Sequence, residues 1–255
     1  MGEASRAGRH GRTERALSFG SAAAAYERGR PEYPAEAIDW LLPRGARRVL
    51  DLGAGTGKLT RQLGERGLDV VAVEPSSGMR DQLARTLPGV TLLAGSAEAI
   101  PLESDAVDAV LVAQAWHWVD PVRAVPEVAR VLAPGGWLGL LWNRRDEREG
   151  WVEQLGRIMH AREHGDGAPT PTIGAPFGPL EHHRVGWRHR LRRAALLDLV
   201  ASRSYVITLD APDRAAILAA VEELIATHPA LADAAELAIP YVTECFRAQT
   251  GAAER

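Results

Sequence analysis

The fold of this chain is decided by one stretch, Arg48-Val49-Leu50-Asp51-Leu52-Gly53-Ala54-Gly55-Thr56-Gly57. Its first half is a short apolar run of the kind that forms a buried strand. Three glycines follow at alternate positions, and glycine lets a backbone turn sharply and approach a ligand closely. Leu59 and Leu63 then lie one helical turn apart, so we expect a helix whose first N–H groups face the same ligand. The stretch therefore predicts a nucleotide-type site.

The spacing of the glycines narrows the kind of ligand. Dinucleotide-binding enzymes use the pattern G-x-G-x-x-G, whereas Gly53, Gly55 and Gly57 are separated by single residues. Asp51 stands two residues before the first glycine, and Glu74 ends the next apolar run, 21 residues after Gly53. A carboxylate at that place can accept hydrogen bonds from both ribose hydroxyls; the alternative is a solvated acid at a strand end. The pattern argues against a nicotinamide oxidoreductase.

Strands and helices alternate along most of the chain. Besides the strand at 48–52, apolar runs predict strands at residues 70–73, 90–93, 107–113, 137–142, 182–191 and 237–246. Helices are expected between them, including segments 194–202 and 217–225. Such alternation implies right-handed crossovers and a parallel sheet with helices on both faces. The predicted fold class is α/β, a doubly wound, mostly parallel seven-stranded sheet.

Proline and glycine interrupt this pattern at four places. Asp120-Pro121 predicts a helix start, with Asp as the N-cap and Pro in the first helical position. Pro126 predicts a kink or a later start, because an interior proline removes a hydrogen bond. We expect a turn at Ala133-Pro134-Gly135-Gly136 and a loop over residues 164–180, which are rich in Gly and Pro.

Five motifs in order resemble those of class I S-adenosylmethionine-dependent methyltransferases. They are Val49 to Gly57, Val70 to Glu74 with Met79, Gly95-Ser96-Ala97-Glu98-Ala99-Ile100-Pro101-Leu102, Asp108 to Trp118, and Leu132-Ala133-Pro134-Gly135-Gly136. The resemblance covers residues 45–143 and implies a Rossmann-like fold. It divides the chain into a flexible tail (1–18) and one domain (19–255), made of lid helices (19–44), a cofactor-binding half (45–143) and an acceptor-side half (144–255).

The resemblance also implies a role for each matched residue. The methionine end of S-adenosylmethionine would be held by Asp51 with Gly53, Ala54, Gly55, Thr56 and Gly57, and its ribose by Glu74. The adenine would contact Pro75, Met79, Ser96, Ala97 and Glu98, and the sulfonium would lie beside Gln114. Ser96 stands where many members have Asp, so its bond to adenine would be weaker. The product would be S-adenosylhomocysteine.

A looser resemblance concerns the subgroup. Phe19-Gly20-Ser21, Ala25 to Pro34, Gln114 to Trp118 and Ser202 to Tyr205 are similar to segments of small-molecule methyltransferases related to the trans-aconitate enzymes. This likeness implies an N-terminal helical lid over the cofactor, in which Tyr26, Arg30 and Tyr33 would contact the acceptor. An arginine such as Arg30 can grip a carboxylate bidentately.

Methyl transfer from a sulfonium needs mainly alignment and exclusion of water, so a catalytic constellation need not be visible. His117 is the candidate general base; the alternative is a structural histidine. Trp116 and Trp118 could wall an acceptor pocket or belong to the core, and Arg144 could bind a carboxylate or be a surface charge. A carboxylate acceptor would need no base. We expect a methyltransferase for a small organic acceptor, acting on a carboxylate or hydroxyl oxygen; the alternative is a cofactor-binding protein of this fold without methylating activity.

Composition and motifs argue against nucleic-acid substrates, metal sites and a location in the membrane. The net charge of −3 implies no general attraction to nucleic acid or anionic membrane, and Gln114-Ala115-Trp116-His117 replaces the Asn/Asp-Pro-Pro-Tyr/Phe motif of base methyltransferases. The histidines lack metal-ligand spacing. With one cysteine, Cys245, no signal peptide and no run near the ~18 apolar residues of a membrane span, we expect a cytoplasmic monomer or homodimer.

Overall fold

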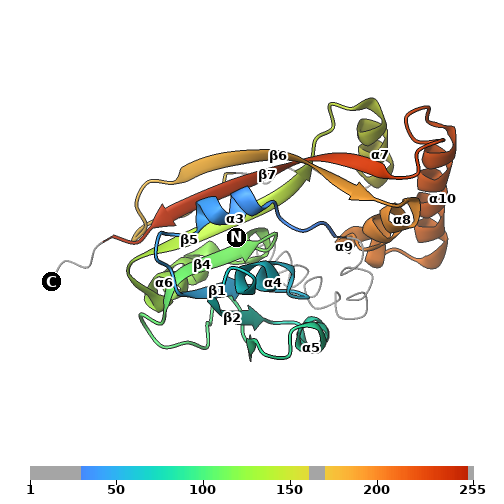
Figure 1. Ribbon diagram of the computed structural model, residues 1–255. Coiled ribbons are helices and arrows are strands. Elements are labelled where there is room, and N and C mark those ends of the chain that lie inside the picture. Colours follow the sequence, from blue (N-terminus) through green and yellow to red (C-terminus); the bar gives the residue numbers. More distant parts are fainter. Residues whose placement is uncertain (1–29, 161–169, 252–255) are drawn as a thin grey trace, which may run out of the picture.

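The computed structural model describes residues 30–160 and 170–251. Its centre is one seven-stranded sheet in the order β3-β2-β1-β4-β5-β7-β6 (Figure 1). The strands are β1 (Arg48–Leu52), β2 (Asp69–Glu74), β3 (Thr91–Ala94), β4 (Val107–Ala113), β5 (Leu132–Arg145), β6 (Glu181–Leu191) and β7 (Leu237–Gln249). The first five pair in parallel, and β7 runs antiparallel to both β5 and β6. The predicted mostly parallel seven-stranded sheet is therefore confirmed.

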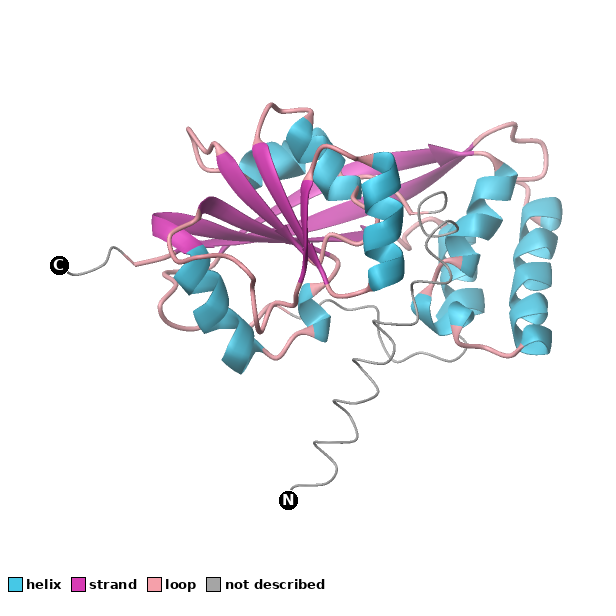
Figure 2. Ribbon diagram, turned by 90° about the horizontal axis from the view of Figure 1, so that it is seen from below, coloured by secondary structure: helices cyan, strands magenta, loops and turns pink. Residues whose placement is uncertain are grey.

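Helices lie on both faces of this sheet (Figure 2). They are α3 (Ala35–Leu41), α4 (Lys58–Gly64), α5 (Ser77–Thr86), α6 (Pro121–Val131), α7 (Gly150–His160), α8 (Arg193–Ala201), α9 (Ser204–Ile207) and α10 (Ala211–Thr227), with a 3-10 turn at Trp116–Trp118. Leu50 of β1 packs with α6 on one face, whereas its neighbour Val49 packs with α3 and α4 on the other. Side chains along a strand alternate between faces. Asp51 therefore shares the face of Val49, toward α4.

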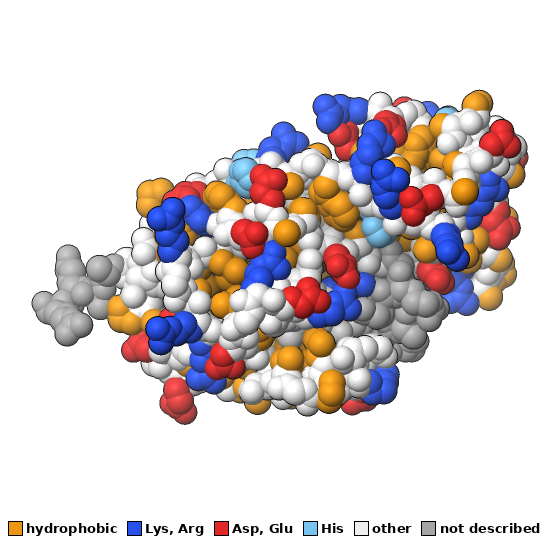
Figure 3. Space-filling view, in the orientation of Figure 1, with side chains coloured by type: hydrophobic (Ala, Val, Ile, Leu, Met, Phe, Trp, Pro, Cys, Tyr) orange, Lys and Arg blue, Asp and Glu red, His pale blue; other side chains and the backbone are white. Residues whose placement is uncertain are grey.

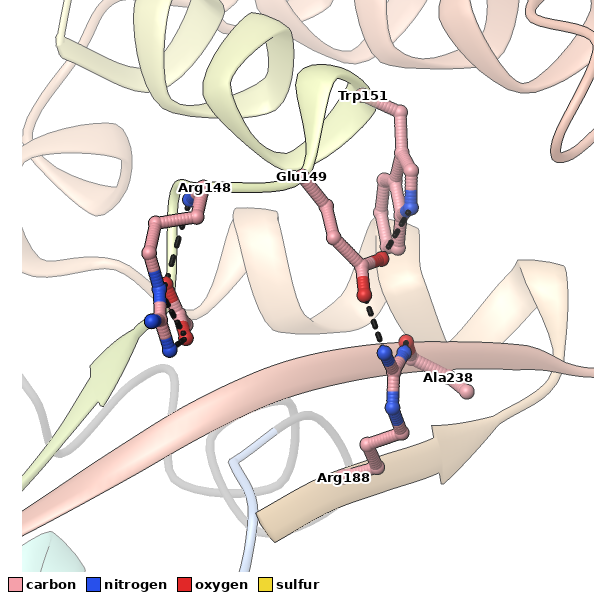
Figure 4. Close-up of polar contacts among 6 residues, drawn as sticks. Arg148, Glu149, Trp151, Arg188 and Ala238 are labelled. Carbon is pink, nitrogen blue, oxygen red and sulfur yellow. Dashed lines mark hydrogen bonds and ion pairs between the residues drawn. The ribbon is translucent and has the colours of Figure 1, made fainter. Parts of the chain in front are cut away.

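The chain forms a second core where β6 and β7 run past the rest of the sheet (Figure 1). Helices α7, α8 and α10 gather at that end and bury residues such as Leu196 together with Tyr241 of β7. Figure 4 shows one attachment of α7 to the sheet: Glu149 accepts a hydrogen bond from Trp151 Nε1 at 3.2 Å and pairs with Arg188 of β6. The antiparallel strands β6 and β7 thus place helices α7, α8 and α10 beside the edge of the sheet at which the parallel strands have their carboxyl ends.

Helix α6 starts at Pro121, as Asp120-Pro121 predicts, with the Asp120 carboxylate accepting from the N–H of Val122 at 3.1 Å. The later start expected from Pro126 is wrong, because the helix continues through this proline. A proline leaves the carbonyl four residues earlier without its helical partner. That carbonyl belongs to Val122, which is 81% exposed. Water can therefore satisfy it at little cost.

The turn predicted at residues 133–136 is also corrected, because strand β5 begins at Leu132 rather than Trp137. Leu132 pairs with Val107, and the next pair joins Trp137 to Ala109, so the residues between them bulge within the strand. Gly135 supports the bulge with a φ of +76°. Residues 170–180 contain no helix or extended strand, in keeping with the predicted loop; its first part, 164–169, lies outside the described residues.

Candidate cofactor and acceptor site

A cleft lies at the carboxyl ends of β1 and β4, the edge at which open α/β sheets bind ligands. Six of the predicted cofactor residues line it: Asp51, Gly53, Ala54, Gly55, Thr56 and Gln114. Two of the predicted acceptor residues, Arg30 and Tyr33, also line it. Among its other lining residues are Lys58, Asn143 and Tyr241, which the sequence did not indicate, and Arg203, which lies in the segment Ser202 to Tyr205. Segments far apart in the chain therefore meet around one space.

Asp51 is the acidic group of this cleft. It is 1% exposed, and its Oδ2 accepts a 2.6 Å hydrogen bond from the Thr60 hydroxyl on α4. Oδ1 is buried with no hydrogen-bond partner among the described residues. Burial raises the pKa of Asp51 to about 7; the bond from Thr60 opposes this rise and the charge of Glu74 adds to it. A buried acceptor without a partner is costly, so Oδ1 is prepared to receive a donor from a ligand.

Gly53 and Gly55 of the loop differ in their surroundings. Gly53 has a φ of +76°, and a Cβ built on it would lie 2.8 Å from the Cβ of Ala115. This position therefore requires glycine for close packing as well as for its backbone angle. Gly55 has a φ of +58°, and nothing lies within 4 Å of a Cβ built there. Since Gly55 lines the cleft, the loop leaves open space where a ligand would pass.

Glu74 ends β2 and forms a hydrogen bond to the glycine loop. Its Oε2 accepts from the N–H of Gly55 at 2.9 Å, and its Oε1 accepts from the N–H of Ser76 at 2.8 Å. Burial raises the pKa of Glu74, while these two backbone bonds and the charge of Arg80 lower it. A carboxylate has about four lone-pair sites, so two bonds leave acceptor capacity for ribose hydroxyls. The alternative of a solvated acid does not fit, since Glu74 is 7% exposed.

Gln114 and Asn143 line the cleft with side-chain amides. Gln114 has a φ of +57°, which is unusual for a residue other than glycine and marks a strained position. Its Nε2 donates to the carbonyl of Asn143 at 3.2 Å. The Asn143 side chain accepts from Thr243 Oγ1 at 2.6 Å and donates to the carbonyl of Glu32 at 2.9 Å. Both amides are thereby held in fixed orientations.

The segment before α3 crosses the cleft. Tyr33 is tied to Gln62 of α4 by two hydrogen bonds, from the Tyr33 N–H at 3.2 Å and to its carbonyl at 2.7 Å. Arg30 Nη2 donates to the carbonyl of Ser202 at 3.4 Å, joining this segment to the turn after α8. Tyr26, predicted for the same lid, lies outside the described residues, so the helical lid stays a prediction.

The predicted adenine residues lie beyond β2 and β3, outside the described cleft. Met79 is buried in α5 and Pro75 is exposed, so Pro75 offers an apolar surface at the strand end. Ala97 is buried, while Ser96 exchanges backbone hydrogen bonds with Ala99. The carboxylate of Glu98 accepts from the N–H of Asp120 at 2.9 Å. Glu98 thus anchors the start of α6, and the adenine contacts remain predictions.

The remaining predicted residues are not in the cleft lining. Trp116 is 6% exposed and packs in the main core, which agrees with the core alternative. His117 is exposed, with its ring 4.7 Å from that of Trp118. Arg144 is exposed and adjoins Asn143 in β5, so its side chain points to the opposite face of the sheet. Roles for these four residues stay predictions.

Further features of the described residues that bear on function are their surface charge, their capacity to bind a metal ion and their capacity to span a membrane. On the face shown in Figure 3, basic and acidic side chains are interspersed. Within residues 30–160 and 170–251 no His, Cys, Asp or Glu cluster has the arrangement of a metal site. The helices described are too short or too polar to cross a membrane.

An open α/β sheet with a glycine loop at the end of β1 defines a Rossmann-like class of protein, and comparisons with known proteins specify it. The model of the methyltransferase domain family matches residues 50–140. An uncharacterized methyltransferase of Mycobacterium tuberculosis is 61% identical over 240 residues, 93% of this chain and 97% of the relative. An uncharacterized methyltransferase-like protein of Schizosaccharomyces pombe is 34% identical over 245 residues, 91% of this chain and 95% of the relative.

A solved structure agrees with these relatives. A protein of Anaeromyxobacter dehalogenans assigned as a type II methyltransferase is 26% identical, with a TM-score of 0.66, over 88% of this chain and 97% of its own. The chain therefore belongs to the class I S-adenosylmethionine-dependent methyltransferase family, as the glycine spacing and the order of the motifs indicate. The trans-aconitate-like subgroup stays a prediction.

Proposed function

We propose that this protein binds S-adenosylmethionine in the cleft and transfers its methyl group to a carboxylate or hydroxyl oxygen of a small organic acceptor. The observation that carries the cofactor assignment is the unpaired, buried Oδ1 of Asp51 in a cleft that Gly55, with open space around it, also lines. An aminoacyl end would bring an ammonium group, whose N–H donors are what Oδ1 lacks. Charge-assisted bonds of this kind contribute ~1.5–3 kcal/mol each.

The residues present fit the aminoacyl and ribose parts of the cofactor. Asp51 would hold the ammonium, the open loop at Gly55 would let the methionine chain pass, and Glu74 would accept from the ribose. Bound S-adenosylmethionine supplies a methyl group that the sulfonium has already activated. The chain's own contribution is to align the acceptor and exclude water, and positioning can supply ~7–11 kcal/mol of a barrier.

The acceptor side of the cleft supports an oxygen nucleophile with negative character. Arg30, Lys58 and Arg203 line it, and Asn143 and Gln114 present fixed amides. A carboxylate is ionised at neutral pH, so these residues need only orient it. A hydroxyl acceptor would require a base, and His117 is the candidate that we retain for that case.

Two measurements test this function. Isothermal titration of the folded protein with S-adenosylhomocysteine should show saturable one-site binding; its absence would refute the cofactor assignment. Transfer of radiolabelled methyl from S-adenosylmethionine should then be measured with matched sets of acids, alcohols, phenols and amines. Turnover confined to oxygen acceptors supports the proposal, and turnover confined to amines contradicts it. Cofactor binding without transfer to any set would favour a binding protein of the same fold.

A further inference from the structure

Two buried polar groups from the C-terminal part of the chain face the cleft without hydrogen-bond partners. Tyr241 of β7 is 2% exposed, and its hydroxyl has no partner within the described ranges. Arg203 follows α8, and its Nε is buried and likewise unpaired in the part of the chain that the structure describes. Buried Tyr hydroxyls and guanidinium groups almost always find a partner. Both residues line the cleft, so their missing partner can belong to a ligand.

The surroundings hold both groups in place. The Tyr241 ring is stacked on Trp187 with a centroid distance of 5.3 Å, and the Trp187 indole N–H donates to Thr243 at 2.9 Å. The backbone N–H of Arg203 donates to the carbonyl of Val200 at 3.1 Å. The Tyr241 ring and the backbone of Arg203 are therefore positioned before any ligand arrives, which lowers the entropy cost of binding.

The charge balance of the cleft indicates what the ligand carries. Among its described lining residues, the cations Arg30, Lys58 and Arg203 face one carboxylate, Asp51. S-adenosylmethionine adds a net positive charge, because it has a sulfonium and an ammonium against one carboxylate. With cofactor bound, the cleft attracts an anion.

We infer that Arg203 and Tyr241 form a receptor for a carboxylate of the methyl acceptor, with the guanidinium Nε–H and the phenol O–H each donating to that group. This inference rests on the proposed methyl transfer and assigns the acceptor to the class of small organic acids. The receptor lies in the acceptor-side half of the chain. Asp51 and Glu74, which are proposed to bind the methyl donor, lie in the cofactor-binding half. The two ligands are thus recognised by different parts of the sequence.

Acetate tests the receptor without knowledge of the natural acceptor. It should bind to protein saturated with S-adenosylhomocysteine, as measured by saturation-transfer NMR, and acetamide, its neutral analogue, should not. Arg203→Met should weaken acetate binding at least about tenfold and Tyr241→Phe several-fold, from the typical strength of charge-assisted bonds. Because both donors serve one group, the double variant should lose less than the product of the two effects. Arg190→Gln is the matched control, since Arg190 is 72% exposed and pairs with Glu236.

Stability distinguishes a receptor from a structural role. Tyr241→Phe removes a buried hydroxyl that has no partner, so the free energy of unfolding should stay unchanged or increase; a structural hydroxyl would lower it. No acetate binding up to about 100 mM, equal binding by wild type and Arg203→Met, or a destabilised Tyr241→Phe would each overturn the inference. Failure of S-adenosylhomocysteine to bind would instead refute the proposed function, so the two failures are distinguishable.

Discussion

The Asp51 carboxylate leads to a pH-dependent prediction about cofactor binding. Burial holds its pKa at about 7 in the free protein, and its unpaired Oδ1 is the proposed acceptor for the ammonium of the ligand. Only the ionised carboxylate attracts a cation. The affinity for S-adenosylhomocysteine should therefore be level above pH 8 and fall about tenfold between pH 8 and pH 6, as the ionised fraction falls.

The variant Asp51→Asn removes this titration. At pH 8 it should bind S-adenosylhomocysteine about 10- to 150-fold more weakly, which corresponds to one charge-assisted bond of ~1.5–3 kcal/mol. Its affinity should change little with pH, so the gap to wild type should narrow as the pH falls. Isothermal titration at pH 6, 7 and 8 measures both quantities. Asp69→Asn is the control, because Asp69 is 65% exposed and pairs with Arg48 at the surface.

The same carboxylate should affect folding in the absence of ligand. A folded-state pKa above the ordinary aspartate value of 3.8 means that the folded protein binds more protons than the unfolded chain between about pH 4 and pH 7. Stability should therefore decrease as the pH rises through this window, and Asp51→Asn should not show this decrease. From pH 5 to pH 8 the difference amounts to ~2–3 kcal/mol, measurable by urea denaturation. Wild-type affinity that does not change between pH 6 and 8, or equal affinity of wild type and Asp51→Asn, would refute the reasoning.

Three further predictions concern residues around the same sheet. Thr60→Val removes the bond that lowers the pKa of Asp51, so the midpoint of the pH dependence of binding should move to higher pH in titrations like those above. Gly53→Ala should lower the free energy of unfolding by about 1–3 kcal/mol, because of its positive φ and its close contact, whereas Gly64→Ala, with open space around it, should not; urea denaturation compares them. Cys245 should resist a disulfide reagent at pH 8 until the protein unfolds, since burial raises its pKa to about 12.

The fold of the cofactor-binding half could be predicted from the sequence because the residues that determine it are neighbours in the chain. A strand, a glycine turn and a helix occupy adjacent positions, so the spacing of Gly53, Gly55 and Gly57 and the place of Asp51 already describe one side of a ligand. The parallel order of the sheet follows from alternating strands and helices. The later start considered for the helix with Pro126 was wrong, because the exposure of Val122 lets the helix continue through this proline. The turn expected at residues 133–136 was wrong, because pairing with the neighbouring strand β4 makes these residues a bulge of β5.

The sequence by itself determined the class of fold, the glycine loop and Asp51, the acid proposed to face the methionine end of the cofactor. Only the tertiary structure decided which distant residues complete the cleft. Asn143 lies in β5, Tyr241 in β7 and Arg203 in the turn after α8, and they meet because β7 inserts antiparallel beside β5 and carries the helical layer with it. Only the packing of this structure shows that the Tyr241 hydroxyl and Arg203 Nε are buried without a protein partner within the described residues.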